Sequence, residues 1–120
     1  MRSNPDELAE LYRQMDTRVY ESELEGRERT ARRHLAIVER YAHGGRLLDV
    51  GCASGLLLHN AAQRGWEVTG VEPSEVLCTE ARKRLAGRAE VHCATLQQAR
   101  LSGSFDAVTL WDVQIGRAHV

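Results

Sequence analysis

Long apolar runs, an excess of one charge and closely spaced cysteine pairs are all missing from this 120-residue chain. Its 16 basic and 17 acidic side chains leave a formal net charge of −1, which excludes the cationic excess typical of nucleic-acid-binding domains. No apolar stretch approaches the roughly 20 residues that a membrane-spanning helix needs. The first residues also lack the apolar core of a signal peptide. We therefore expect a cytoplasmic protein with no membrane or nucleic-acid partner.

Cysteine is scarce, and the spacing of its three residues gives no indication of a metal site. The three cysteines are Cys52, Cys78 and Cys93, an odd number at wide spacings, which favours reduced thiols over a disulfide framework. No Cys-x-x-Cys pair occurs, so we expect no metal site. Cys52 is interpreted as a small loop residue rather than a nucleophile because no histidine partner can be identified for it.

Residues 1–43 are polar and predicted to be helical. A first helix opens at Pro5, with an apolar face formed by Leu8, Leu11, Tyr12 and Met15, which recur at helical spacing. A second helix is predicted from about Arg27 to Ala42, and Gly44 ends it. Its apolar stripe comprises Ala31, Leu35, Val38 and either Tyr41 or Ala42. The arginines of 27–33 are interpreted as a solvated face of this helix.

From Arg46 onward, short apolar segments alternate with helical ones. The pattern predicts strands over 47–50, 67–71, 89–93 and 105–111, with helices over about 55–64 and 74–85. Ser54 is predicted to cap the first of these helices, and Ser74 opens the second. Alternating strands and helices indicate an α/β fold, a doubly wound parallel sheet with right-handed crossovers.

The loop after the first strand carries the first candidate site. In such folds ligands bind at the carboxyl ends of the strands. Gly51 permits a sharp turn there, and Gly55 allows the next helix to start tight against the sheet. Free amides at that helix start suit an anionic group, whereas Asp49 suits an ammonium group. A ligand with both charges, such as an amino acid, fits this pair of features.

Two nucleotide-binding fingerprints fail in the same loop. The dinucleotide motif G-x-G-x-x-G is broken by Ala53 and Leu56, which opposes a nicotinamide dehydrogenase. A phosphate-binding P-loop would need a following Gly-Lys-Ser/Thr, which is absent. Glu72 ends the second strand, where a carboxylate can accept hydrogen bonds from both ribose hydroxyls. An amino-acid end together with a ribose points to S-adenosylmethionine.

Three segments carry a family resemblance. Residues 47–55 (LLDVGCASG), 68–74 (VTGVEPS) and 104–113 (SFDAVTLWDV) resemble the successive motifs of class I S-adenosylmethionine-dependent methyltransferases. The resemblance implies a Rossmann-like doubly wound sheet with N-terminal helices. Only about four of the family's usual seven strands can be read in this sequence.

The same resemblance implies roles for individual residues. The loop residues Gly51, Cys52, Ala53 and Gly55 would pass under the methionine part of the cofactor, with Asp49 near its ammonium group. Glu72 would hold the ribose, and Pro73, Thr95 and Leu96 would lie near the adenine. Thr95 departs from the family pattern, which has an acidic residue there. Trp111 would lie beside the methionine, although it is equally consistent with plain core.

The resemblance also divides the chain. Residues 1–43 would form a helical cap and 44–113 the cofactor-binding half, whereas 114–120 match no family element and are interpreted as a non-native tail. The implied activity is methyl transfer to a small-molecule acceptor, with no catalytic base identified among these residues. We expect the 120-residue chain to be inactive on its own. The alternative is a cofactor-binding or misfolded fragment without turnover.

Overall fold

The computed structural model describes the backbone of residues 5–110 and the side chains of Glu7 and residues 21–110. Three helices and four strands follow one another along the chain. They are α1 (Pro5–Tyr41), β1 (Arg46–Val50), α2 (Leu56–Gln63), β2 (Glu67–Val71), α3 (Glu75–Leu85), β3 (Ala89–His92) and β4 (Ala107–Thr109). The predicted alternation of strands and helices is therefore confirmed, with the fourth strand shorter than expected and the third ending one residue early.

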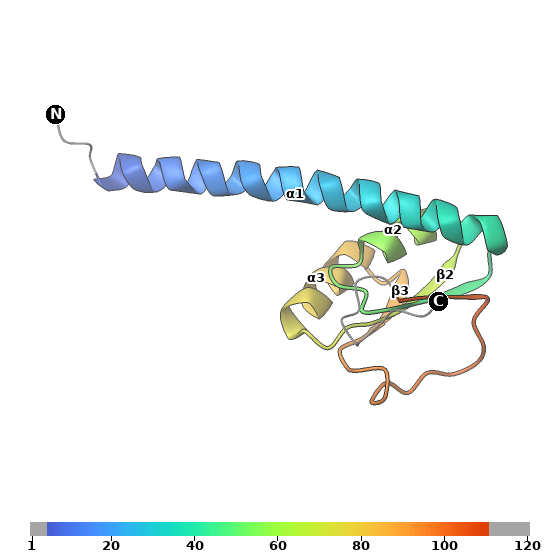
Figure 1. Cartoon of the computed structure of the whole chain (residues 1–120). Helices are drawn as coiled ribbons and strands as arrows, with labels where there is room; N and C mark the ends of the chain where they lie inside the picture. Colours follow the sequence, from blue (N-terminus) through green and yellow to red (C-terminus); the bar gives the residue numbers. More distant parts are fainter. Residues whose placement is uncertain (1–4, 111–120) are drawn as a thin grey trace.

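The prediction of two N-terminal helices is wrong, because α1 is one continuous 37-residue helix. No proline interrupts it after Pro5, and a single helical glycine such as Gly26 costs only about 1 kcal/mol. The N-terminal half of α1 extends away from the rest of the domain, while the other half lies along α2 (Figure 1). The predicted face formed by Leu8, Leu11, Tyr12 and Met15 falls outside the described side chains.

The second half of α1 packs through the predicted stripe. Ala31 and Leu35 are buried, and Ala42 packs against the same core. Tyr41 is 84% exposed, so Ala42 and not Tyr41 completes the stripe. The helix ends before Gly44, whose φ of +113° is readily accessible only to glycine.

The four strands form one parallel sheet in the order β3-β2-β1-β4. Successive strands move outward from β1 to β3, and the chain then crosses back to place β4 on the other side of β1. This reversal is the doubly wound topology that the sequence predicts, and it creates a switch point between β1 and β4.

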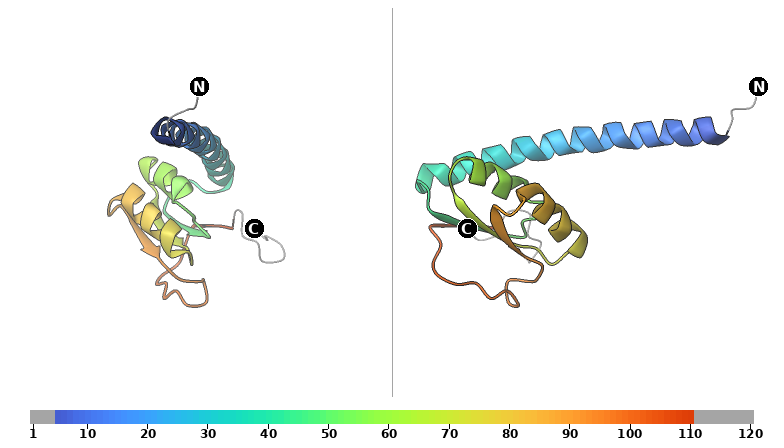
Figure 2. Two further views of the ribbon diagram at one scale, coloured as in Figure 1. Left: turned by 90° about the vertical axis from the view of Figure 1, so that its left-hand side faces the viewer. Right: turned by 180° about the vertical axis from the view of Figure 1, so that it is seen from behind.

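Two apolar layers cover the sheet. The three helices lie on one face, where α2 and α3 contribute much of the larger buried cluster together with Leu47 and Val68 of the sheet (Figure 2). On the other face, Leu48, Val50 and Val71 are covered by the segment between β3 and β4. The two helical crossovers, α2 and α3, therefore run over one side of the sheet, and the segment between β3 and β4 crosses the other.

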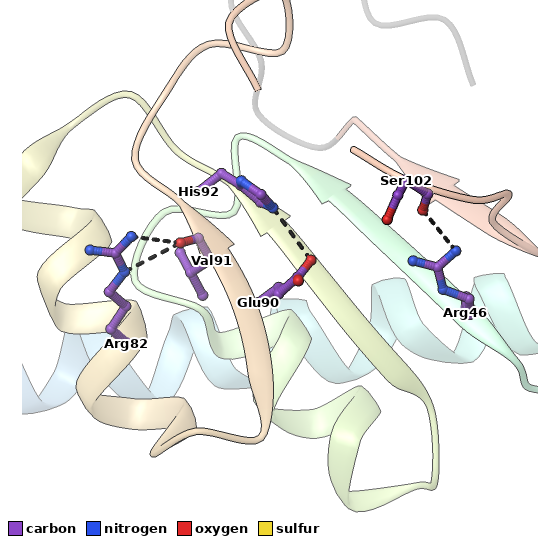
Figure 3. A network of polar contacts seen from close by, with 6 residues as sticks. All are labelled: Arg46, Arg82, Glu90, Val91, His92 and Ser102. Atoms are coloured by element: carbon purple, nitrogen blue, oxygen red, sulfur yellow. Dashed lines mark hydrogen bonds and ion pairs between the residues drawn. The ribbon is translucent and has the colours of Figure 1, made fainter. Parts of the chain in front are cut away.

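Arg46 fixes the approach to β4. Its guanidinium donates to the carbonyl of Ser102 (Figure 3) and to that of Ser104, and the group lies 4.4 Å from the centre of the Phe105 ring. The Arg46 amide also donates to the Asp106 carboxylate at 2.8 Å. These contacts hold the start of β4 against β1. Within residues 5–110, no helix is long and apolar enough to cross a bilayer.

Candidate active site

The loop after β1 is tied to the end of β2. The amides of Gly51 and Cys52 both donate to the carbonyl of Val71, at 2.8 and 3.1 Å. Gly51, Ala53 and Gly55 all have left-handed backbones, with φ values of +75°, +51° and +84°. A side-chain-bearing residue such as Ala53 adopts this conformation at a cost of about 1–2 kcal/mol. The loop is thus held in a shape that exposes backbone at the carboxyl edge of the sheet.

Glu72 joins this loop to the start of α3. Its side chain is buried, with Oε1 accepting from the Ala53 amide at 2.9 Å and Oε2 accepting from the Ser74 amide at 2.8 Å. An ionised carboxylate can accept about four hydrogen bonds, so this one retains capacity for further donors. Glu72 is thus a buried residue of the site and not a surface carboxylate.

Gly55, not Ser54, occupies the cap position of α2, and no side-chain hydrogen bond caps this helix. The predicted cap is therefore wrong. Ser54 is instead buried, and its carbonyl accepts a hydrogen bond from the guanidinium of Arg84. A Cβ at Gly55 would lie 3.1 Å from the Ala81 Cβ. The close approach that requires this glycine is thus to α3, and not to the sheet as expected.

Asp49 lies at the switch point, paired across the sheet with Thr109. Its carboxylate is buried and accepts a 2.8 Å hydrogen bond from the Thr109 hydroxyl. Sequence reasoning missed Thr109, since only the parallel register of β1 and β4 brings the two residues together. The hydrogen bond fixes the carboxylate immediately before the glycine loop.

Cys52 is a core residue. Its side chain is 4% exposed, and a Cβ added at Gly70 would meet its sulfur at 2.8 Å. Burial raises the pKa of the Cys52 thiol to about 12, and the nearby charges of Asp49 and Glu72 act in the same direction. The thiol is protonated at neutral pH, so Cys52 lacks the thiolate that nucleophilic catalysis needs.

Pro73 follows β2, and the predicted residues Thr95 and Leu96 follow β3. The backbone connects this strand to the site, because the Glu72 amide donates to the His92 carbonyl at 2.9 Å. Thr95 forms a local turn in which its hydroxyl accepts from the Gln98 amide, while its own amide donates to the Gln98 side chain. Pro73 and Leu96 are exposed. Trp111 and the predicted tail lie outside the described residues.

The prediction of three reduced thiols is wrong for two of them. Cys78 in α3 and Cys93 just after β3 form a disulfide, with their Cα atoms 5.6 Å apart. The helix carries Cys78 back over the sheet toward the strand that follows it, a proximity that a separation of 15 residues does not reveal. Only Cys52 is a free cysteine.

A cleft of about 980 Å³ separates α1 from the glycine loop. Gly51 and Ala53 line one wall, and the opposite wall includes Arg27, Arg29 and Arg33. These arginines are exposed, as predicted for a solvated face, yet they also border the cleft, which sequence reasoning missed. In the described part of the chain, no salt bridge neutralises them, and the three arginines outnumber the one carboxylate on this wall, that of Glu23, so the wall is cationic.

Comparison with known proteins decides the family. Residues 47–119, more than half of the chain, match the family described as methyltransferase domain. The chain belongs to the class I S-adenosylmethionine-dependent methyltransferase family. A Rossmann-like methyltransferase fold also agrees with the strand order and with the site at the carboxyl edge.

Relatives of this methyltransferase chain include curated enzymes and solved structures. It is 42% identical over 71 residues to a ubiquinone biosynthesis O-methyltransferase of Alkalilimnicola ehrlichii, covering 55% of this chain and 29% of that protein. The mitochondrial ubiquinone biosynthesis O-methyltransferase of Schizosaccharomyces pombe is 33% identical over 76 residues, with 58% and 28% covered. The chain thus spans about 30% of the length of these relatives.

Among solved structures, an S-adenosylmethionine-bound amino pentose methyltransferase from Micromonospora echinaspora shares 30% identity and a TM-score of 0.59, with 75% of this chain and 40% of that chain covered. DesVI of Streptomyces venezuelae also shares 30% identity and a TM-score of 0.59, with coverages of 78% and 41%. The parallel sheet and its helices therefore have counterparts in structures of this family.

Proposed function

We propose that the chain forms the S-adenosylmethionine-binding half of a methyltransferase that acts on a small-molecule acceptor. The observation that carries this proposal is Glu72, a buried carboxylate at the end of β2 that also holds the glycine loop through the Ala53 amide. A carboxylate in this place suits a ribose, and the loop beside it offers backbone to the amino-acid end of the same ligand.

The residues present fit each part of this cofactor. The methionine part would lie over Gly51, Cys52, Ala53 and Gly55, with its ammonium group near Asp49. Its carboxylate would face the cationic wall of the cleft, where guanidinium groups suit a carboxylate. Glu72 would bind the ribose, and Pro73, Thr95 and Leu96 would border the adenine. In this proposal residues 1–43 act as a cap, because α1 forms one wall of the cleft.

The chemistry asked of this half is modest. The bound cofactor supplies a sulfonium methyl group that is already activated. The chain's own residues would bind and orient the cofactor and exclude water from it, which accounts for much of the rate enhancement in such transfers. None of the histidines is assigned as a base. Turnover by these 120 residues alone is not expected, and a cytoplasmic location stays a prediction.

Oxygen is the acceptor atom we propose to test first. The two curated relatives reported above are both named as O-methyltransferases of ubiquinone biosynthesis, whereas one structural relative is named as an amino pentose methyltransferase. The whole protein that carries this chain should be offered matched small phenols and amines with a labelled methyl donor. Label only in the amine products would overturn the choice of oxygen while leaving the methyltransferase proposal intact.

Cofactor binding is the direct test of the proposed function. Isothermal titration of the 120-residue chain should show binding of S-adenosylhomocysteine and no response to NAD. Arg27→Gln and Arg33→Gln should weaken binding of S-adenosylhomocysteine, with Arg40→Gln as the control because it lies on the same helix outside this cleft. Binding of NAD without binding of S-adenosylhomocysteine would overturn the proposal.

A further inference from the structure

The Cys78–Cys93 disulfide lies between two walls of the candidate adenosine site. Cys78 belongs to α3, whose first turn follows Glu72 and Pro73. Cys93 directly follows His92, whose carbonyl accepts from the Glu72 amide, and it stands two residues before Thr95. The bridge therefore connects the helix on one side of the site to the turn on the other.

The residues that precede Cys93 in the sequence are held by several hydrogen bonds to other elements. The Arg82 guanidinium donates twice to the Val91 carbonyl, at 2.8 and 3.2 Å, which fixes the end of β3 to α3 (Figure 3). His92 is held in addition by its backbone bond to Glu72, and its ring lies 3.5 Å from the Glu90 carboxylate. The strand itself thus stays in place whether or not the disulfide exists.

Contacts after Cys93 are different. Residues 94–98 make hydrogen bonds among themselves, through the turn in which Thr95 and Gln98 bind each other, and the Ala99 amide adds one bond to the Thr95 carbonyl at 2.9 Å. The next apolar contacts with the sheet come from Ala99 and Leu101. Among the described hydrogen bonds, ion pairs and disulfides, the Cys78–Cys93 bridge is therefore the only one that ties the segment 93–99 to another part of the domain.

We propose that this disulfide is a redox switch of the cofactor site, closed when it holds the 93–98 turn against α3 and open when it is reduced. The proposal rests on the proposed function, because Thr95 and Leu96 in this turn are the residues assigned to the adenine. Opening the bridge frees the turn, and the cofactor must then order it on binding, which lowers affinity.

The chemistry is ordinary thiol–disulfide exchange with a small thiol such as glutathione. Cys93 is exposed whereas Cys78 is fully buried, so the attacking thiolate reaches the Cys93 sulfur and Cys78 departs and takes up a proton. A second thiolate then releases the mixed disulfide from Cys93. In total, two thiols lose two electrons and two protons to the protein disulfide, and glutathione disulfide reverses the reaction. Cys52 takes no part because it is buried and protonated.

The test compares the full chain equilibrated in glutathione disulfide with the chain in dithiothreitol, after mass spectrometry of the alkylated protein has counted its thiols. Amide hydrogen exchange of residues 93–98 should be slower in the oxidised form. The dissociation constant for S-adenosylhomocysteine should be lower in that form by about fivefold or more. Cys93→Ser should behave like the reduced protein in both buffers.

Three outcomes would overturn the switch: no disulfide in glutathione disulfide, equal hydrogen exchange in the two forms, or equal dissociation constants. If neither form binds S-adenosylhomocysteine, the proposed function fails. Hydrogen exchange would then still decide separately whether the bridge holds the turn. Cys78→Ser provides the second variant, because loss of either sulfur should abolish the response to redox buffer.

Discussion

The carboxylate of Glu72 accepts a hydrogen bond from the amide of Ala53, a residue 19 positions earlier whose backbone is left-handed. This contact offsets part of the cost of the unusual conformation, since a hydrogen bond to a charged group contributes roughly 1.5–3 kcal/mol. The second oxygen of Glu72 binds the Ser74 amide, at the start of α3. One side chain therefore sets the shape of the glycine loop and its distance from the helix.

Removal of this carboxylate should affect both stability and binding. In Glu72→Ala the Ala53 and Ser74 amides lose their partner, and the free energy of unfolding should fall by roughly 2–4 kcal/mol. Affinity for S-adenosylhomocysteine should fall by about tenfold or more. Urea denaturation and isothermal titration measure the two effects. Glu80→Ala is the matched control, because Glu80 is an exposed carboxylate of α3; equal effects in both variants would contradict the role given to Glu72.

Alanine substitution at two glycines distinguishes the cost of tight packing at the start of α2 from the cost of backbone strain. Gly55→Ala places a Cβ 3.1 Å from the Ala81 Cβ and should cost roughly 2–4 kcal/mol, because overpacking adds to left-handed strain. Gly65→Ala has a similar φ of +92° but meets nothing within 4 Å, so strain alone should cost about 1–2 kcal/mol. Chemical denaturation of both variants gives the difference. Equal losses of stability in the two variants would show that α2 and α3 move apart at no cost to admit the added methyl group.

The hydrogen bond at the switch point predicts the behaviour of Thr109→Val. Valine conserves the shape of the side chain but removes the donor to the buried Asp49 carboxylate. The free energy of unfolding should fall by roughly 1–3 kcal/mol. Thr69→Val is the control: Thr69 is also buried in the sheet, but no side-chain hydrogen bond is described for it. A Thr109→Val protein as stable as this control would mean that Asp49 does not depend on Thr109.

Burial of Cys52 predicts a loss of stability at alkaline pH. The folded-state pKa of about 12 lies above the ordinary value of 9.0, so the unfolded chain releases this proton first as pH rises. The protonated Cys52 thiol makes its full contribution to the free energy of unfolding below about pH 9. Above that pH, the free energy of unfolding should fall by about 1.4 kcal/mol per pH unit as pH rises toward 12.

Urea denaturation at several pH values between about 8.5 and 10.5, with the other cysteines oxidised, measures this slope. Cys52→Ala should show a shallower decline over the same interval, because it lacks the buried thiol. Parallel curves for the two proteins would mean that Cys52 ionises as readily in the folded state as in the unfolded chain.

The sequence alone determined the order of elements and the position of the loop. Apolar segments of strand length, punctuated by glycines, predict β1 and β2 within a residue, because local hydrophobic pattern and turn chemistry act over a few neighbours. The same logic places Gly51 and Glu72 at the ends of strands and Gly55 at the start of a helix. It fails over α1, where it predicts a break in the polar segment before Arg27 although nothing in that segment stops a helix.

Tertiary structure decided the partners of those residues. That Asp49 meets Thr109, that Glu72 binds Ala53 and that Gly55 packs on Ala81 all depend on parallel register and helix packing between distant segments. The same reason hid the Cys78–Cys93 disulfide and the cationic wall of the cleft. Local pattern fixes which backbone conformation a segment adopts, whereas the contacts across the sheet arise only when the crossovers bring separate segments together.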